Sequence, residues 1–205
     1  MLQGVDFAAA YTAAMTEQRT GRWSAAAIRH QLGLPRATLS KSLGRLEEAG
    51  LVREAYLNRR LLAALLPLLP NLIPARPLSA IPVRGLVTGF AAPAFGGHFR
   101  APMAHVWELD AGPDLGLPIK PLHRQIPGHL MATGDARVHA LMAYLDAVRG
   151  GRAREVAHGG EGVRLLCGLP ASPGLRPSAS TEALMGELVG RLPEGGVVGR
   201  VAVDA

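Results

Sequence analysis

The chain has 205 residues, of which 48% are hydrophobic, so it can bury a core in one ordinary domain or in two small ones. This composition excludes disorder along the whole chain. Lysine and arginine number 22 against 16 aspartates and glutamates, which gives a formal charge of +6. A basic balance of this size favours an anionic partner without identifying one.

Cysteine usage and hydropathy indicate the compartment. Cys167 is the only cysteine, which excludes a disulfide within the chain and favours a reducing environment. Residues 1–6 contain no basic stretch followed by an apolar run, so we expect no secretory signal. The longest apolar run, residues 61–69, is broken by Pro67 and is about half as long as a membrane span. We therefore expect a soluble cytoplasmic protein that does not enter a membrane.

Breaker residues divide the chain. Residues 5–66 are rich in alanine, leucine and arginine, and we predict that they are mainly helical. Residues 67–127 hold eleven of the 16 prolines. Because proline fits neither a helix interior nor a central strand, the short apolar runs 84–90 and 105–109 are predicted to be strands between turns.

Helical spacing returns after Asp135, which is suited to cap a helix over residues 136–150. Beyond the glycines that end this helix we predict further elements: a strand over 163–169, a linker over 170–180, a helix over 181–192 and a strand over 197–203. The basic cluster at the end of the 136–150 helix, Arg149, Arg152 and Arg154, suits a helix C-terminus in any protein, and it also suits a phosphate or an acidic partner.

The most informative segment is 23–52. Ser24 can cap a first helix, and Trp23 before it can pack on Ile28. Gly33 provides the left-handed residue that ends a helix, and Pro35 fits the first turn of the next one. The segment therefore predicts two short helices joined by a tight turn.

The second of these helices has two unlike faces. Leu39, Leu43 and Leu46 share one side at helical spacing and are predicted to pack on a preceding helix. The other side is small, hydroxylic or cationic: it carries Ala37, Thr38, Ser40, Lys41, Gly44 and Arg45, with Arg36 at its start. Small residues let a helix enter the major groove, while hydroxyls and cations reach phosphates and base edges.

This segment resembles the winged helix-turn-helix of bacterial transcription regulators, especially over residues 34–52, where Gly50 would turn the chain and Leu51 would begin a wing. The sequence departs from that pattern after Arg53. Residues 54–66 favour a short extended piece and then a helix, so minor-groove contacts by a wing are doubtful, and Arg59 and Arg60 are candidates to touch phosphate instead.

The second half is similar to regulators of the antitoxin class over residues 73–76, 84–93, 121–124 and 145–155. In that class a winged-helix N-terminus precedes a small C-terminal domain. The resemblance implies that a toxin, often a nucleotidyltransferase-like protein, is a partner.

Other functions remain open at this stage. A tri-helical core also serves proteins that use it only to dimerise or to bind other proteins, such as a toxin. Residues 19–60 contain nine basic and three acidic side chains, however, whereas a merely solvated face would mix the two signs evenly. Glu108, Asp110 and Asp114 would suit acid–base chemistry or magnesium, but turns are rich in aspartate anyway. No histidine spacing, nucleophile motif or phosphate loop is recognisable, so we predict no enzyme activity, cofactor or metal.

These observations predict an α+β protein with a helix-turn-helix domain over residues 1–66, an α+β domain over 67–169 and a terminal segment over 170–205. The expected function is a sequence-specific DNA-binding regulator, a repressor or an antitoxin, that binds duplex DNA as a homodimer. The alternative is a protein-interaction module. The expected DNA contacts are Arg36, Ala37, Thr38, Ser40, Lys41, Gly44, Arg45, Arg59 and Arg60.

Overall fold

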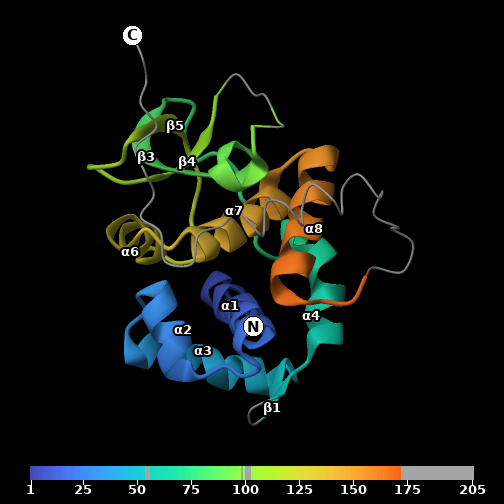
Figure 1. The fold of residues 1–205 in the computed structure, drawn as a ribbon. Helices are drawn as coiled ribbons and strands as arrows, with labels where there is room; N and C mark the ends of the chain where they lie inside the picture. Colours follow the sequence, from blue (N-terminus) through green and yellow to red (C-terminus); the bar gives the residue numbers. More distant parts are fainter. Residues whose placement is uncertain (54–55, 98, 100–102, 172–205) are drawn as a thin grey trace.

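The computed structural model describes residues 1–53, 56–97, 99 and 103–171. The helix and strand expected over 181–203 lie outside these residues. The fold is mixed α and β, as predicted, with helices dominant. In Figure 1 a small sheet lies at the top, α7 and α8 lie beneath it, and α1, α2 and α3 follow below. None of the described helices is long and apolar enough to cross a membrane.

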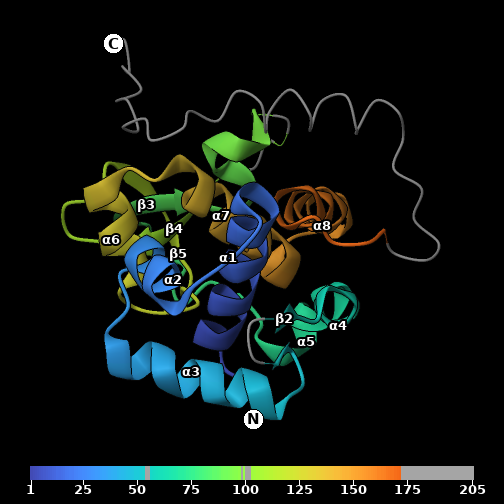
Figure 2. The same ribbon diagram turned by 60° about the horizontal axis from the view of Figure 1, so that its bottom comes forward.

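Helix α1 (Gly4–Thr20) forms the centre of the molecule. Every residue from 5 to 16 is buried, and five of these are alanines, which let neighbouring helices approach closely. Helix α1 contacts α2 and α3 on one side and α7 and α8 on another (Figure 2). A single cluster of buried hydrophobic side chains runs from Val5 to Leu169, so the core is continuous across the two predicted domains.

The elements that follow α1 are short and stay close to it. They are α2 (Ala25–Leu32), α3 (Arg36–Glu48), β1 (Val52–Arg53), β2 (Tyr56–Leu57), α4 (Arg59–Leu65), the 3-10 turn η1 (Leu66–Leu68) and α5 (Leu69–Leu72). Strands β1 and β2 pair antiparallel, with Val52 opposite Leu57. The short extended piece expected after Arg53 is confirmed as β2, and the helix expected after it is confirmed as α4.

The proline-rich middle forms a closed three-stranded barrel. Its strands are β3 (Val83–Thr88), β4 (His105–Glu108) and β5 (Asp114–Pro118), and two 3-10 turns, η2 (Gly89–Ala91) and η3 (Pro93–Phe95), follow β3. Strand β3 pairs antiparallel with both of the others, which pair parallel with each other. A Cβ on Gly85 would lie 2.2 Å from the carbonyl oxygen of Trp107, so only glycine fits there. Both predicted strands are confirmed within two residues.

Three helices complete the described chain: α6 (Ile126–Thr133), α7 (Ala136–Gly150) and α8 (Ala153–Cys167). The cap expected for α7 is confirmed, because the Asp135 carboxylate accepts hydrogen bonds from the amides of Arg137 and Val138. The strand expected over residues 163–169 is wrong, since most of it belongs to α8. Glycines on α8 allow close helix packing: a Cβ on Gly162 would lie 2.6 Å from the Tyr144 ring of α7.

A buried carboxylate ties α7 to the barrel. Asp146 accepts hydrogen bonds from the Thr88 hydroxyl at 2.9 Å and the Trp107 indole at 2.7 Å, and it pairs with Arg149. Arg149 also donates to the carbonyl of Ile73 at 2.8 Å. Burial raises the pKa of Asp146, while these partners stabilise its charge. Arg149 therefore has a structural role, which is one of the two explanations considered for its basic cluster.

We expect the free energy of unfolding to decrease as the pH is lowered past about 6.5, because of His139. This side chain is 5% exposed, and its Nε2 lies 2.7 Å from the carbonyl oxygen of Val87. Burial lowers the pKa of His139 in the folded state, so the unfolded chain takes up the proton first as the pH falls. Between about pH 7.5 and pH 5.5 in urea denaturation, the wild type should lose on the order of 1 kcal/mol more than His139→Gln. Equal losses in the two proteins would contradict this assignment.

Candidate nucleic-acid interface

The turn between α2 and α3 has the predicted chemistry. The Ser24 hydroxyl accepts a hydrogen bond from the Ala27 amide at 3.1 Å and so caps α2. Gly33 ends α2 with φ of +63°, and a Cβ there would also strike the ring of His129 on α6. Pro35 stands just before α3, one residue earlier than expected. Local turn residues and packing by α6 together fix the angle at which α3 leaves α2.

The inner face of α3 is held by apolar packing and by one ion pair. Leu39, Ser42 and Leu46 are buried, and Leu43 is partly buried against the core. The Arg45 guanidinium binds the Asp6 carboxylate of α1 through two hydrogen bonds of 2.8 and 2.7 Å. Asp6 is completely buried. These hydrogen bonds raise the pKa of Arg45, and they fix the rotation of α3 on α1.

The outer face of α3 carries most of the predicted contact residues. Arg36, Ala37, Ser40 and Lys41 are exposed, and Thr38 and Gly44 are half-buried. In Figure 2, α3 lies along the edge of the molecule, away from the barrel. Glu47 and Glu48 are exposed at its C-terminal end, so positive charge is confined to the first half of the helix.

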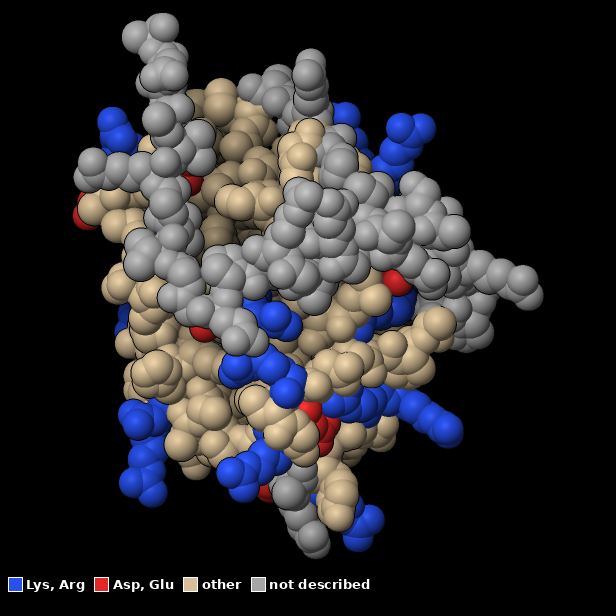
Figure 3. Space-filling model, in the orientation of Figure 1, with Lys and Arg blue, Asp and Glu red and all other residues tan. Residues whose placement is uncertain are grey.

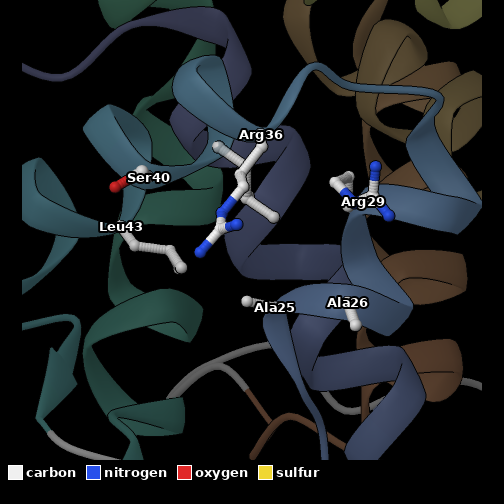
Figure 4. A pocket seen from close by; sticks show the side chains of 7 residues that line it. Ala25, Ala26, Arg29, Arg36, Ser40 and Leu43 are labelled. Atoms are coloured by element: carbon white, nitrogen blue, oxygen red, sulfur yellow. The ribbon is translucent and has the colours of Figure 1, made fainter.

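A groove of about 560 Å³ separates α2 from α3. Its lining combines two arginines with small and apolar side chains: Ala25, Ala26, Arg29, Arg36, Leu39, Ser40 and Leu43. Figure 4 shows Arg36 extending from α3 over the groove, with Arg29 on α2 beside it and Ala25 below. The groove thus places two guanidinium groups next to the outer face of α3.

Two of the predicted DNA contacts are held by ion pairs within the fold. Arg45 is held by Asp6, as described above. Arg59 donates to the Glu17 carboxylate at 3.1 and 2.8 Å and to the carbonyls of Cys167 and Gly168. Both guanidinium groups therefore join elements of the fold, and neither is a free cation. Their partners lie 39 and 42 residues away in the chain or further, beyond the reach of a local pattern.

Four exposed basic residues were not among the predicted DNA contacts: Arg19, Arg22, Arg29 and Arg53. Seven exposed basic residues make no ion pair with another described residue: Arg19, Arg22, Arg29, Arg36, Lys41, Arg53 and Arg60. In Figure 3, basic side chains project from the lower part of the molecule, where α2, α3 and β1 lie in Figure 1. Their clustering from residue 19 onward was the available signal. Exposed Tyr56 on β2 adds an aromatic ring to this side.

The residues considered for catalysis differ in their surroundings. Glu108 and Asp110 are exposed, whereas the Asp114 carboxylate accepts a hydrogen bond from the Val87 amide. Within the described ranges, no three histidine, cysteine, aspartate or glutamate side chains are placed to hold a metal ion.

Comparison of the chain with protein-family models, curated proteins and solved structures gave no match. Interpretation of the α3 surface therefore rests on its geometry and charge.

Two arginines on α3, Arg45 and Arg36, should contribute unequally to protein stability. Arg45→Ala leaves the buried Asp6 carboxylate without its partner, so we expect a loss of about 2 to 4 kcal/mol in the free energy of unfolding. Arg36→Ala, the matched control on the same helix, should change it by less than about 0.5 kcal/mol because Arg36 is exposed. Urea denaturation measures both. A loss for Arg45→Ala no larger than that of the control would show that the ion pair does not hold α3.

Proposed function

We propose that the protein is a sequence-specific DNA-binding regulator that inserts the outer face of α3 into the major groove. The observation that supports this most directly is the division of α3 into two faces. The inner face is fixed by buried leucines and by the Arg45–Asp6 pair. The outer face is exposed, has small side chains and is flanked by unpaired cations.

Size and charge both suit this docking. The major groove is about 12 Å wide and admits one helix, and short side chains such as Ala37 and Ser40 keep the helix narrow. The first half of α3 carries Arg36 and Lys41, whereas Glu47 and Glu48 would be repelled by phosphate. The N-terminal half of α3 should therefore lie deepest in the groove, as is usual for recognition helices.

The surrounding cations suit the DNA backbone. Arg29 lines the groove beside α3, Arg53 lies at the end of β1, which packs against α3, and Arg60 lies on α4. Contacts of this kind supply salt-dependent affinity without reading sequence. Lys41 on the outer face of α3 suits a phosphate contact of this kind. Sequence would be read by Arg36 and Ser40, which have donors or acceptors for base edges, and by the Ala37 methyl group, which suits contact with thymine.

Binding as a homodimer is part of this proposal. One short helix with few long side chains offers limited discrimination, and two copies on a two-fold site would double the contacts. Occupancy of such a site near a promoter would make the protein a repressor. The resemblance to antitoxins adds a toxin as a candidate second partner.

Removing Lys41 should weaken DNA binding in a salt-dependent way. We expect Lys41→Ala to weaken binding to all duplexes and to reduce the slope of log affinity against log salt by roughly one unit, because one phosphate contact is lost. Arg84→Ala, which removes an exposed cation from β3, is the matched control and should leave the slope unchanged. The measurement is fluorescence anisotropy with a labelled duplex at several salt concentrations. An unchanged slope for Lys41→Ala would contradict the assigned contact, and no duplex binding by the wild type would favour the protein-interaction alternative.

Gly44→Ala should raise protein stability and weaken DNA binding. A Cβ at this position meets no atom within 4 Å, so the fold does not require glycine there. Gly44→Ala should stabilise the protein by about 0.5 to 1 kcal/mol, since glycine is unfavourable within a helix. The same variant should bind duplex DNA more weakly, because the added methyl group occupies the face that approaches the bases. If Gly44→Ala is stabilised but binds duplex DNA as strongly as the wild type or more strongly, the face at Gly44 does not contact the bases.

A further inference from the structure

A second hollow, of about 420 Å³, lies where the start of α1 meets the second half of the chain. Its volume is within the range of small-molecule sites. It is lined from four parts of the chain: Gln3, Gly4 and Val5; Ile73 and Pro74; Lys120, Pro121, Leu122 and His123; and Arg149. The lining contains three basic side chains and no acidic one.

The basic groups differ in how they are held. Arg149 is fixed by Asp146 and by the Ile73 carbonyl, and three of its five N–H groups have acceptors when the Lys120 carbonyl at 3.3 Å is included. The Lys120 ammonium is exposed and makes no ion pair with another described residue. The hollow therefore combines a rigid guanidinium group with a lysine that is free to turn toward a ligand.

His123 adds a directed donor. Its Nδ1 lies 3.4 Å from the amide nitrogen of Gln125, which donates to it. In the neutral ring the proton is then on Nε2, which is left to donate.

The remainder of the lining is largely apolar and includes Val5, Ile73 and Leu122. Gly4 brings the α1 backbone against this wall, because a Cβ there would lie 2.6 Å from the Leu122 carbonyl oxygen. The amides of Gly4 and Val5 occupy the first helical positions, which have no acceptor within the helix. Donors on one side and apolar walls on the other suit a ligand with a charged end and a hydrocarbon body.

We infer that this hollow binds a small organic anion, a carboxylate or a phosphate monoester, between Lys120, His123 and Arg149. Both headgroups are compact anions that accept several hydrogen bonds, so the same donors suit either.

A ligand in the hollow would affect the position of α3 through two hydrogen bonds. The backbone amide of Gln3, which lines the hollow, donates to Asp6 Oδ2 at 2.7 Å. The same oxygen accepts from Arg45 Nε at 2.8 Å. A ligand that moves Gln3 therefore changes the carboxylate that holds α3. This consequence rests on the proposed DNA binding, whereas the anion site itself does not.

The site is tested on the full chain with phenyl phosphate and benzoate, and with benzyl alcohol as an uncharged analogue. We expect at least one of the two anions to bind saturably by isothermal titration calorimetry and the alcohol not to bind. Lys120→Ala should weaken that binding about tenfold or more, the effect of losing one charge-assisted hydrogen bond. Arg84→Ala, which removes an exposed cation from β3, should leave it unchanged. Saturable binding of neither anion, or equal weakening by both variants, would overturn the proposal.

The link to α3 is measured separately. At constant ionic strength, the anion that binds should change the duplex affinity of the wild type and leave that of Lys120→Ala unchanged. Anion binding without a change in duplex affinity would contradict the connection through Asp6, although it would still support the anion site. Absence of duplex binding in any condition would instead count against the proposed function, and the calorimetric result would still decide whether the anion site exists.

Discussion

The structure depends on burying α1 on nearly every side. Residues 5–16 of this helix are all buried, although they include the polar side chains of Asp6, Thr12 and Thr16. A helix that is apolar around its circumference must be surrounded. Here α2 and α3 cover one side and α7 and α8 another, so the half that contains α2 and α3 and the half that contains the barrel share one central element. The alanines of α1 make this sharing possible, because they let helices approach from several directions.

Two ion pairs near the ends of α1 determine which cations remain for a partner. Asp6 near its start binds Arg45 of α3, and Glu17 near its end binds Arg59 of α4. Both arginines lie among the nine basic residues between positions 19 and 60. The fold thus uses two of them to position α3 and α4, and the seven others are exposed between the end of α1 and the start of α4. Charge that is clustered in the sequence therefore has two distinct uses in the structure.

The elements that sequence analysis predicted correctly are those fixed by neighbouring residues. Ser24, Gly33 and Asp135 act locally, through hydrogen bonds or dihedral angles within a few residues, and all three have the expected roles. The alternation of prolines with short apolar runs likewise located β3 and β4. The exposed face of α3 could be predicted because helical periodicity separates it from Leu39 and Leu46.

The errors arise from contacts between distant residues. The strand expected over residues 163–169 is instead the end of α8, where Gly159 and Gly162 give room to the α7 backbone and to the Tyr144 ring. The roles of Arg45 and Arg59 depend on Asp6 and Glu17, which no local pattern connects to them. The hollow at the start of α1 could not be predicted from the sequence either, since its basic groups come from Lys120, His123 and Arg149 and its other wall comes from the start of α1.

Arg45 and Arg59 hold the fold through ion pairs, whereas different, exposed cations are proposed to bind the partner. Stability and the proposed function therefore depend on separate residues. Arg45 and Arg59 would be costly to remove because their acceptors are buried or shared between elements, whereas Arg36 and Lys41 lie in water and contribute little to folding. Like charges gathered around α3 repel one another weakly across solvent, and a polyanion is the partner that relieves this repulsion. Substitutions on the outer face of α3 should therefore alter the proposed DNA binding while the helix stays anchored through Asp6.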